Sequence, residues 1–170
     1  MPQRKKLEAE LSKLMGTINF AKVLFCLKRK FELWSLYNLS KDGYPKIKIG
    51  YMPFLMNIGV EGTTNKKLAA KLNVTKQAMS KTLKELEGLN LIEFKPNPVD
   101  ARSSLIVLTL YGMQVAIHAR KKVDLLSEKY IEIMGEKKYE DMLSSMNMLI
   151  DIHISFEEQG TYPKHVEDDF

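Results

Sequence analysis

The chain has 170 residues, 45% of them hydrophobic and 28% charged, a composition that predicts a folded globular protein and excludes a disordered or collagen-like chain. No apolar run reaches the roughly 18 residues of a membrane span and no secretory signal is recognisable, so we expect a cytoplasmic protein that does not enter a membrane. The single cysteine excludes an intramolecular disulfide. The net charge of +5 is spread unevenly: residues 1–30 and 65–102 are basic, whereas residues 139–170 are acidic.

Residues 17–39 are expected to form one long helix, because apolar side chains recur along it at helical spacing. The apolar stripe extends onto more than one face, which is more than the core of a small domain can cover. We therefore expect a second buried surface, such as an interface between two subunits. A turn follows at residues 40–45, and a short helix at residues 50–58 accommodates Pro53 only near its first turn.

Two helices joined by a tight turn are predicted next. Thr64 is a suitable N-cap for a helix that ends near Leu72, and Asn73 can adopt the left-handed conformation that a tight turn requires. Thr75 caps the second helix, which covers about residues 75–88. The apolar face of this second helix is formed by Met79, Leu83 and Leu86, and its other faces are polar.

A β-hairpin with a long tip follows. Two strand-like runs, residues 91–95 and 104–109, flank a loop at residues 96–103 that is rich in Pro, Asn and Asp. Arg102 in this loop suits the narrow minor groove of A·T-rich DNA, and Asp100 is placed to orient the guanidinium of Arg102. Thr109 can then cap a long helix to Met134, which a last helix at residues 136–156 and an acidic, frayed tail follow.

This order of helix, turn, helix and hairpin is that of a winged helix-turn-helix, which binds DNA. Hydroxyl and amine groups at the start of the second helix suit phosphates, while Gln77 can pair with adenine and Lys81 with guanine in the major groove. The residues that we expect to contact DNA are Thr75, Lys76, Gln77, Ser80, Lys81, Lys84, Asp100 and Arg102.

The segment from Asn65 to Gly112 resembles the winged helix-turn-helix core of the MarR family of bacterial transcription regulators, most specifically in Asp100-Ala101-Arg102 and the following Leu108-Thr109. The resemblance extends over residues 17–156. It implies an obligate homodimer that binds a pseudo-palindromic operator in double-stranded DNA and acts as a repressor that a small ligand or an oxidant releases. It also implies that the second helix enters the major groove and that Asp100 and Arg102 belong to the wing. Ala101 departs from the family, since many members carry a second basic residue there.

Other interpretations stay open beside this one. Cys26 is expected to be a small buried hydrophobic residue, with an oxidant-sensing regulator as the alternative. Phe31, Trp34 and Tyr37 are expected in the core, with a ligand cavity as the less favoured interpretation. A winged-helix module that binds a protein in place of DNA is the alternative from another class. No spacing of His, Cys or carboxylate residues predicts a metal site, and no residue pattern predicts a cofactor or an enzyme.

The predicted fold is therefore mainly α, with a small β wing. Its expected parts are an N-terminal dimerisation helix in residues 1–45, a winged helix-turn-helix lobe in 46–110, C-terminal dimerisation helices in 111–158 and an acidic tail in 159–170.

Overall fold

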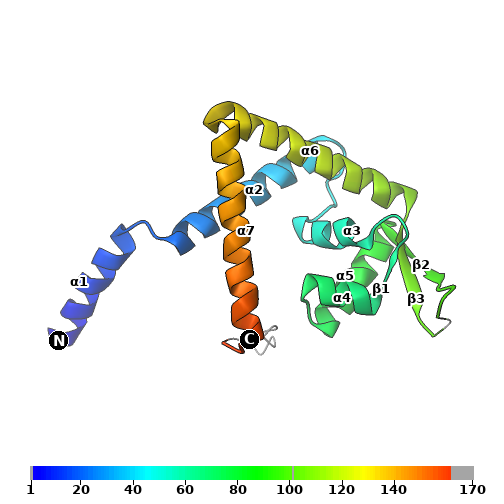
Figure 1. The fold of residues 1–170 in the computed structure, drawn as a ribbon, viewed down its shortest axis with the longest axis horizontal. Helices are drawn as coiled ribbons and strands as arrows, with labels where there is room; N and C mark the ends of the chain where they lie inside the picture. The colour runs from blue at the N-terminus through cyan, green and yellow to red at the C-terminus, as the bar shows by residue number, and fades with distance from the viewer. Residues whose placement is uncertain (1, 101, 162–170) are drawn as a thin grey trace. The chain divides into compact units, whose positions relative to one another are not determined.

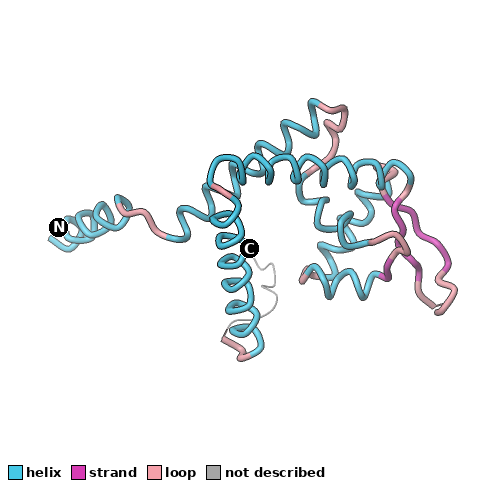
Figure 2. Tube along the Cα trace, turned by 45° about the horizontal axis from the view of Figure 1, so that its top comes forward, coloured by secondary structure: helices cyan, strands magenta, loops and turns pink. Residues whose placement is uncertain are grey.

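The structure is a computed structural model that describes residues 2–100 and 102–161, without the side chains of Pro2 and Lys76. The chain divides into two compact units, residues 1–49 and 50–170. Helices dominate both units, and the strands form one small antiparallel sheet in the second unit (Figure 2). The prediction of a mainly α fold with a small β wing is confirmed.

The first unit contains two helices, α1 (Pro2–Gly16) and α2 (Phe20–Lys41), which Figure 1 shows in blue at the N-terminal end of the chain. The α2 helix begins after Asn19, whose Oδ1 accepts the backbone N–H of Lys22 at 2.9 Å, and lies within three residues of the predicted range 17–39. The α1 helix was not predicted, because its sequence is dominated by charge and has only a narrow apolar stripe.

Two expectations about side chains of α2 are wrong for the single chain. Cys26 is exposed, although we expected a buried small residue. Phe31 and Tyr37 are not core residues either, since they are 37% and 65% exposed, and Trp34 is only half-buried and stacks on Phe31 with the ring centroids 6.1 Å apart. The reason is that α2 has apolar side chains on more sides than its own chain covers, as the width of its stripe indicated.

The other elements lie in the second unit, apart from Ile49 at the start of η1. In chain order they are η1 (Ile49–Tyr51), α3 (Met52–Ile58), β1 (Thr63–Thr64), α4 (Asn65–Leu72), α5 (Lys76–Gly88), β2 (Ile92–Pro96), β3 (Ser104–Leu108), α6 (Leu110–Met134) and α7 (Glu136–Glu158). The predicted elements of this unit are all present, and Pro53 lies in the first turn of α3 as expected.

Three threonines begin three of these helices. The side chains of Thr64, Thr75 and Thr109 accept the backbone N–H of the residue three positions later, at 3.4, 3.2 and 2.9 Å. Between α4 and α5, Asn73 adopts the left-handed conformation with φ 51° and ψ 46°. The capping and turn residues predicted from sequence are therefore confirmed, and they fix where α4, α5 and α6 start.

The sheet has the strand order β1-β3-β2, with both pairs antiparallel. The hairpin of β2 and β3 runs in register from Ile92 opposite Leu108 to Pro96 opposite Ser104. The short β1, in which Thr63 pairs with Ile106, was not predicted because two residues give no alternating pattern. Its pairing places the start of α4 directly beside the base of the wing.

The core of the second unit is apolar and draws on both helices of the helix-turn-helix, the hairpin and α6. The side chains with at most 1% exposure include Leu68, Met79, Leu86, Leu91, Ile92, Ile106 and Val115. Met79, Leu83 and Leu86 are all buried, so the predicted apolar face of α5 is confirmed. Burial of this face determines which side of α5 remains for a partner.

Candidate nucleic-acid interface

The α5 helix presents a polar surface opposite its buried face. Gln77, Ser80, Lys81 and Lys84 are exposed, and their spacing of three and four residues places them along one side of the helix. Thr75 is half-buried and its hydroxyl caps the helix. The side chain of Lys76 lies outside the described part of the structure. Five of the six predicted helix residues therefore have a described side chain, and four of these are exposed.

The back of α5 is tied to the preceding part of the unit by a hydrogen bond that the sequence did not indicate. The hydroxyl of Tyr51, a residue 4% exposed, donates to Oε2 of Glu85 at 2.6 Å. The acceptor is a carboxylate, which makes the bond stronger than one between neutral groups. The two residues are 34 positions apart and belong to no motif, so no sequence signal pairs them.

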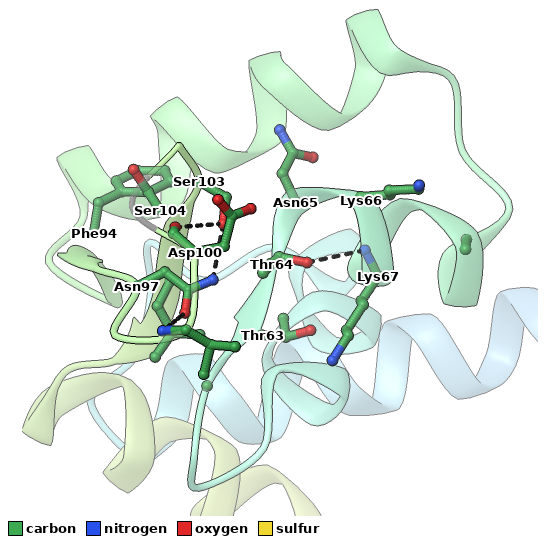
Figure 3. Close-up of a pocket in the computed structure, with 14 residues that line it drawn as sticks. Thr63, Thr64, Asn65, Lys66, Lys67, Phe94, Asn97, Asp100, Ser103 and Ser104 are labelled. Atoms are coloured by element: carbon green, nitrogen blue, oxygen red, sulfur yellow. Dashed lines mark hydrogen bonds between the residues drawn. The ribbon is translucent and has the colours of Figure 1, made fainter.

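An open groove lies between the start of α4 and the wing, with a volume of about 990 Å³ (Figure 3). Its lining includes Lys66 and Lys67 of α4, and Asn97, Ser103 and Ser104 of the wing. The first backbone N–H groups of α4 also point to this end of the helix, where the helix dipole favours an anion. From the sequence, Lys66 and Lys67 belong to a basic stretch whose lysines, over residues 66–84, are expected to contact DNA. The pairing of β1 with β3 places these two lysines beside the wing.

The wing loop is held by hydrogen bonds within itself. Asp100 accepts the backbone N–H of Arg102 on its Oδ1 at 3.0 Å, and Asn97 accepts the backbone N–H of Val99 at 3.0 Å. Asn97 also donates from Nδ2 to Oγ of Ser103 at 2.8 Å. The sequence suggested a contact from Asp100 to the guanidinium of Arg102, whereas the structure gives a contact to its backbone. Arg102 itself is exposed.

The charge on these elements is mainly positive. Lys66, Lys67, Lys81, Lys84 and Arg102 are all exposed. Of the nearby acids, Glu93 is paired with Lys95 at 2.9 Å and Glu85 accepts the bond from Tyr51, while Glu87 and Asp100 are exposed. Exposed amines, an amide and a guanidinium on a helix-turn-helix and its wing are the groups that bind phosphates and base edges of DNA.

The remaining predicted residues lie elsewhere in the chain. Cys26, Phe31, Trp34 and Tyr37 all belong to α2, in the first unit. Among the described residues, no group of three or more His, Cys, Asp or Glu side chains is arranged to hold a metal ion. In the same part of the chain, none of the helices combines the length and apolar character that crossing a membrane would require.

Comparisons with known proteins agree with this geometry. Residues 56–104 match the profile of the MarR family. The structure is similar to that of Streptococcus pneumoniae FabT in complex with DNA, with a TM-score of 0.72 and 21% sequence identity over 80% of this chain and 96% of FabT. It is also similar to S. aureus MepR in a complex with DNA, with a TM-score of 0.67 and 17% identity over 79% of this chain and 98% of MepR.

A third similar structure is the transcriptional repressor CouR bound to a 23-mer DNA duplex, with a TM-score of 0.66 and 20% identity over 83% of this chain and 95% of CouR. Among curated protein sequences, none matches this chain. The fold is therefore that of the MarR-type winged-helix regulators.

Proposed function

From the match of residues 56–104 to the MarR family, we propose that this chain belongs to that family and is a DNA-binding transcription regulator that represses its target genes. The observation that carries the proposal is the polar, basic side of α5, which the burial of Met79, Leu83 and Leu86 turns outward. The three similar proteins described above were solved with DNA, which supports the same activity here. Such a protein acts where the DNA is, in the cytoplasm.

In the proposed complex α5 enters the major groove and the wing reaches the minor groove. Gln77 and Lys81, one turn apart on the exposed side, reach base edges, while Lys84 and the start of α4 bind phosphates. Arg102 enters the minor groove, where narrow A·T segments have the strongest negative potential. Lys76 is assigned to the same phosphates from its sequence position alone.

A protein-binding module is the rival function, and the composition of the α5 surface argues against it. Protein interfaces have an apolar, often aromatic centre. Among the described residues, large exposed hydrophobic side chains occur on α1, α2, α3, β2, α6 and α7 and in loops, but none occurs on α5. The exposed side of α5 therefore suits DNA better than a protein.

The experiment that tests the function starts from duplexes enriched from a random-sequence library by the purified protein. We expect an enriched site with two-fold symmetry, for which Lys81→Ala loses roughly 10- to 100-fold in affinity and relaxes the base preference at one position of each half-site. Arg120→Ala is the control, since it removes the same charge from α6, where Arg120 pairs with Asp124 at 2.8 Å. No enrichment at all would favour the protein-binding module.

We further propose that the protein works as a homodimer. In the single chain α7 has no buried residue, and exposed apolar side chains run along both α7 and α2, among them Phe25, Leu149 and Ile150. Apolar surface of this extent marks an interface. The opposite charges of the two ends, basic over residues 1–30 and acidic over 139–170, favour association of two copies through these helices. Two-fold symmetry then explains a pseudo-palindromic operator.

Sedimentation equilibrium tests the dimer. Wild-type protein is expected at twice the mass of the chain at micromolar concentration, and Phe25→Asp or Ile150→Asp is expected to shift it to the monomer and to weaken operator binding. Val60→Asp is the matched control, because Val60 is 92% exposed in the loop between α3 and β1, outside α5, the wing and the apolar sides of α2 and α7. A wild-type protein that sediments as a monomer at all concentrations would contradict the proposal.

Release by an effector completes the proposed function. In a dimer, the two copies of α5 can lie at a spacing that fits DNA or at one that does not. A small ligand that binds the second arrangement more tightly lowers the DNA affinity by the difference between its affinities for the two arrangements. The stacked Phe31 and Trp34, with Tyr37 one turn further, are the candidate ligand contacts. Exposed Cys26 is the candidate for an oxidant. Peroxide release of DNA that persists in Cys26→Ser would remove the oxidant alternative, and a ligand that abolishes binding without changing the helix spacing would contradict the mechanism.

A further inference from the structure

We propose that Asn97 and Ser103 are positioning residues for Arg102: their side chains close the neck of the wing loop and thereby fix the point from which Arg102 enters the minor groove. This inference rests on the proposed DNA binding. We call the hydrogen-bonded pair of Asn97 and Ser103 the clip. Figure 3 shows these two side chains facing each other across the loop.

The clip connects both ends of the loop. Nδ2 of Asn97 donates to Oγ of Ser103 at 2.8 Å, and Oδ1 of Asn97 accepts the backbone N–H of Val99 at 3.0 Å. The hydroxyl of Ser103 in turn donates to the backbone carbonyl of Asp100 at 3.2 Å, which also accepts the backbone N–H of Ser103 at 3.0 Å. Oδ1 of Asp100 accepts the backbone N–H of Arg102 at 3.0 Å, so the bonds lead from Asn97 to Arg102.

The sheet does not need these bonds. Pairing between β2 and β3 ends with Pro96 opposite Ser104, and residues 97–103 lie beyond it. Asn97 and Ser103 are only half-buried, and no described residue between positions 97 and 103 is part of the buried core. What the clip stabilises is therefore the conformation of the loop, and a loop held in its bound conformation loses less entropy on binding DNA.

The donors and acceptors of the clip can be satisfied by few residue types. The hydroxyl of Ser103 accepts one bond and donates another at the same time, which threonine can also do and alanine cannot. Asn97 uses its amide as a donor and its carbonyl as an acceptor, and alanine provides neither. Ser103→Thr should therefore preserve the clip, while Ser103→Ala and Asn97→Ala should open it.

The test uses the operator enriched by the wild-type protein and a second duplex in which the steps contacted by the wing are changed from A·T to G·C. Asn97→Ala and Ser103→Ala are each expected to lose roughly five- to tenfold in affinity for the A·T operator and little for the G·C duplex, so that discrimination between them falls. Ser103→Thr is expected to keep the wild-type discrimination. Unchanged melting temperatures would show that the fold is intact.

A double variant isolates the route through Arg102. If the clip acts by positioning Arg102, Asn97→Ala loses no further affinity in an Arg102→Ala background. An equal loss of operator affinity in both backgrounds would contradict the positioning role of the clip while leaving DNA binding established. So would Asn97→Ala and Ser103→Ala variants that both discriminate between the two duplexes as the wild type does. Absence of specific DNA binding by the wild-type protein would overturn the proposed function, and the clip with it.

Discussion

Gly112, in the first turn of α6, lies against the backbone of Leu91, and replacing it with alanine should test the packing of the second unit. A Cβ at this position would be 1.9 Å from the carbonyl oxygen of Leu91, 2.8 Å from its carbonyl carbon and 3.2 Å from its Cα. All three atoms are backbone, so no rotation of a side chain relieves the clash. Leu91 is fully buried, and its carbonyl also accepts the backbone N–H of Thr109 at 3.1 Å.

Two opposed contributions decide whether Gly112→Ala raises or lowers the free energy of unfolding. In an open helical position, glycine to alanine would stabilise the protein by about 1 kcal/mol. Here ordinary contact begins at 3.4 Å, so α6 and Leu91 must separate by about 1.5 Å. Overpacking of a core costs about 1–3 kcal/mol, and losing the Thr109 to Leu91 hydrogen bond adds about 1 kcal/mol. We expect Gly112→Ala to lower the free energy of unfolding by about 1–3 kcal/mol.

Urea unfolding at matched protomer concentration measures this difference, because the stability of a dimer depends on concentration. Gly88→Ala in α5 is the matched control: a Cβ there has no atom within 4 Å, so its effect should stay within about 1 kcal/mol of the wild type. Gly112→Ala with wild-type or higher stability would refute the close approach of α6 to Leu91.

Substitutions at three further positions test the elements that orient α5 and α6. Tyr51→Phe removes the bond to Glu85 and should cost about 1–2 kcal/mol in urea unfolding; no loss would mean that the bond contributes nothing. Thr109→Val removes both the cap on Gly112 and the bond to the carbonyl of Asn90, and should cost about 1–2 kcal/mol, with an unchanged unfolding midpoint as the contrary result. Asn73 has φ 51°, so Asn73→Gly should have a free energy of unfolding about 1 kcal/mol higher than Asn73→Ala in thermal unfolding. The reverse order would contradict the left-handed turn.

The sequence predicted those features that depend on neighbouring residues. Thr64, Thr75 and Thr109 begin helices because a hydroxyl beside an apolar pattern caps the first turn, and Asn73 tolerates the left-handed turn by its own chemistry. Burial of one face of α5 followed from helical spacing, and this burial leaves the candidate DNA surface exposed.

Features that depend on distant pairing could not be predicted. β1 exists because Thr63 lies opposite Ile106, 43 positions later in the sequence, and this pairing brings Lys66 and Lys67 to the wing. The bond between Tyr51 and Glu85 joins residues that have no common motif. Burial of Cys26 was wrongly expected because an apolar stripe does not say whether its own chain or a partner covers it.

The proposed function requires that α5 and the wing bind DNA in a sequence-specific way. The affinity of the purified protein for the enriched operator and for random duplex DNA, measured across a salt series beside Arg102→Ala, tests this requirement. We expect a specific excess for the operator, a steep loss of affinity with salt, and for Arg102→Ala weaker binding with a salt slope smaller by about one. Equal affinity for both duplexes, or an Arg102→Ala variant that binds like the wild type, would contradict it.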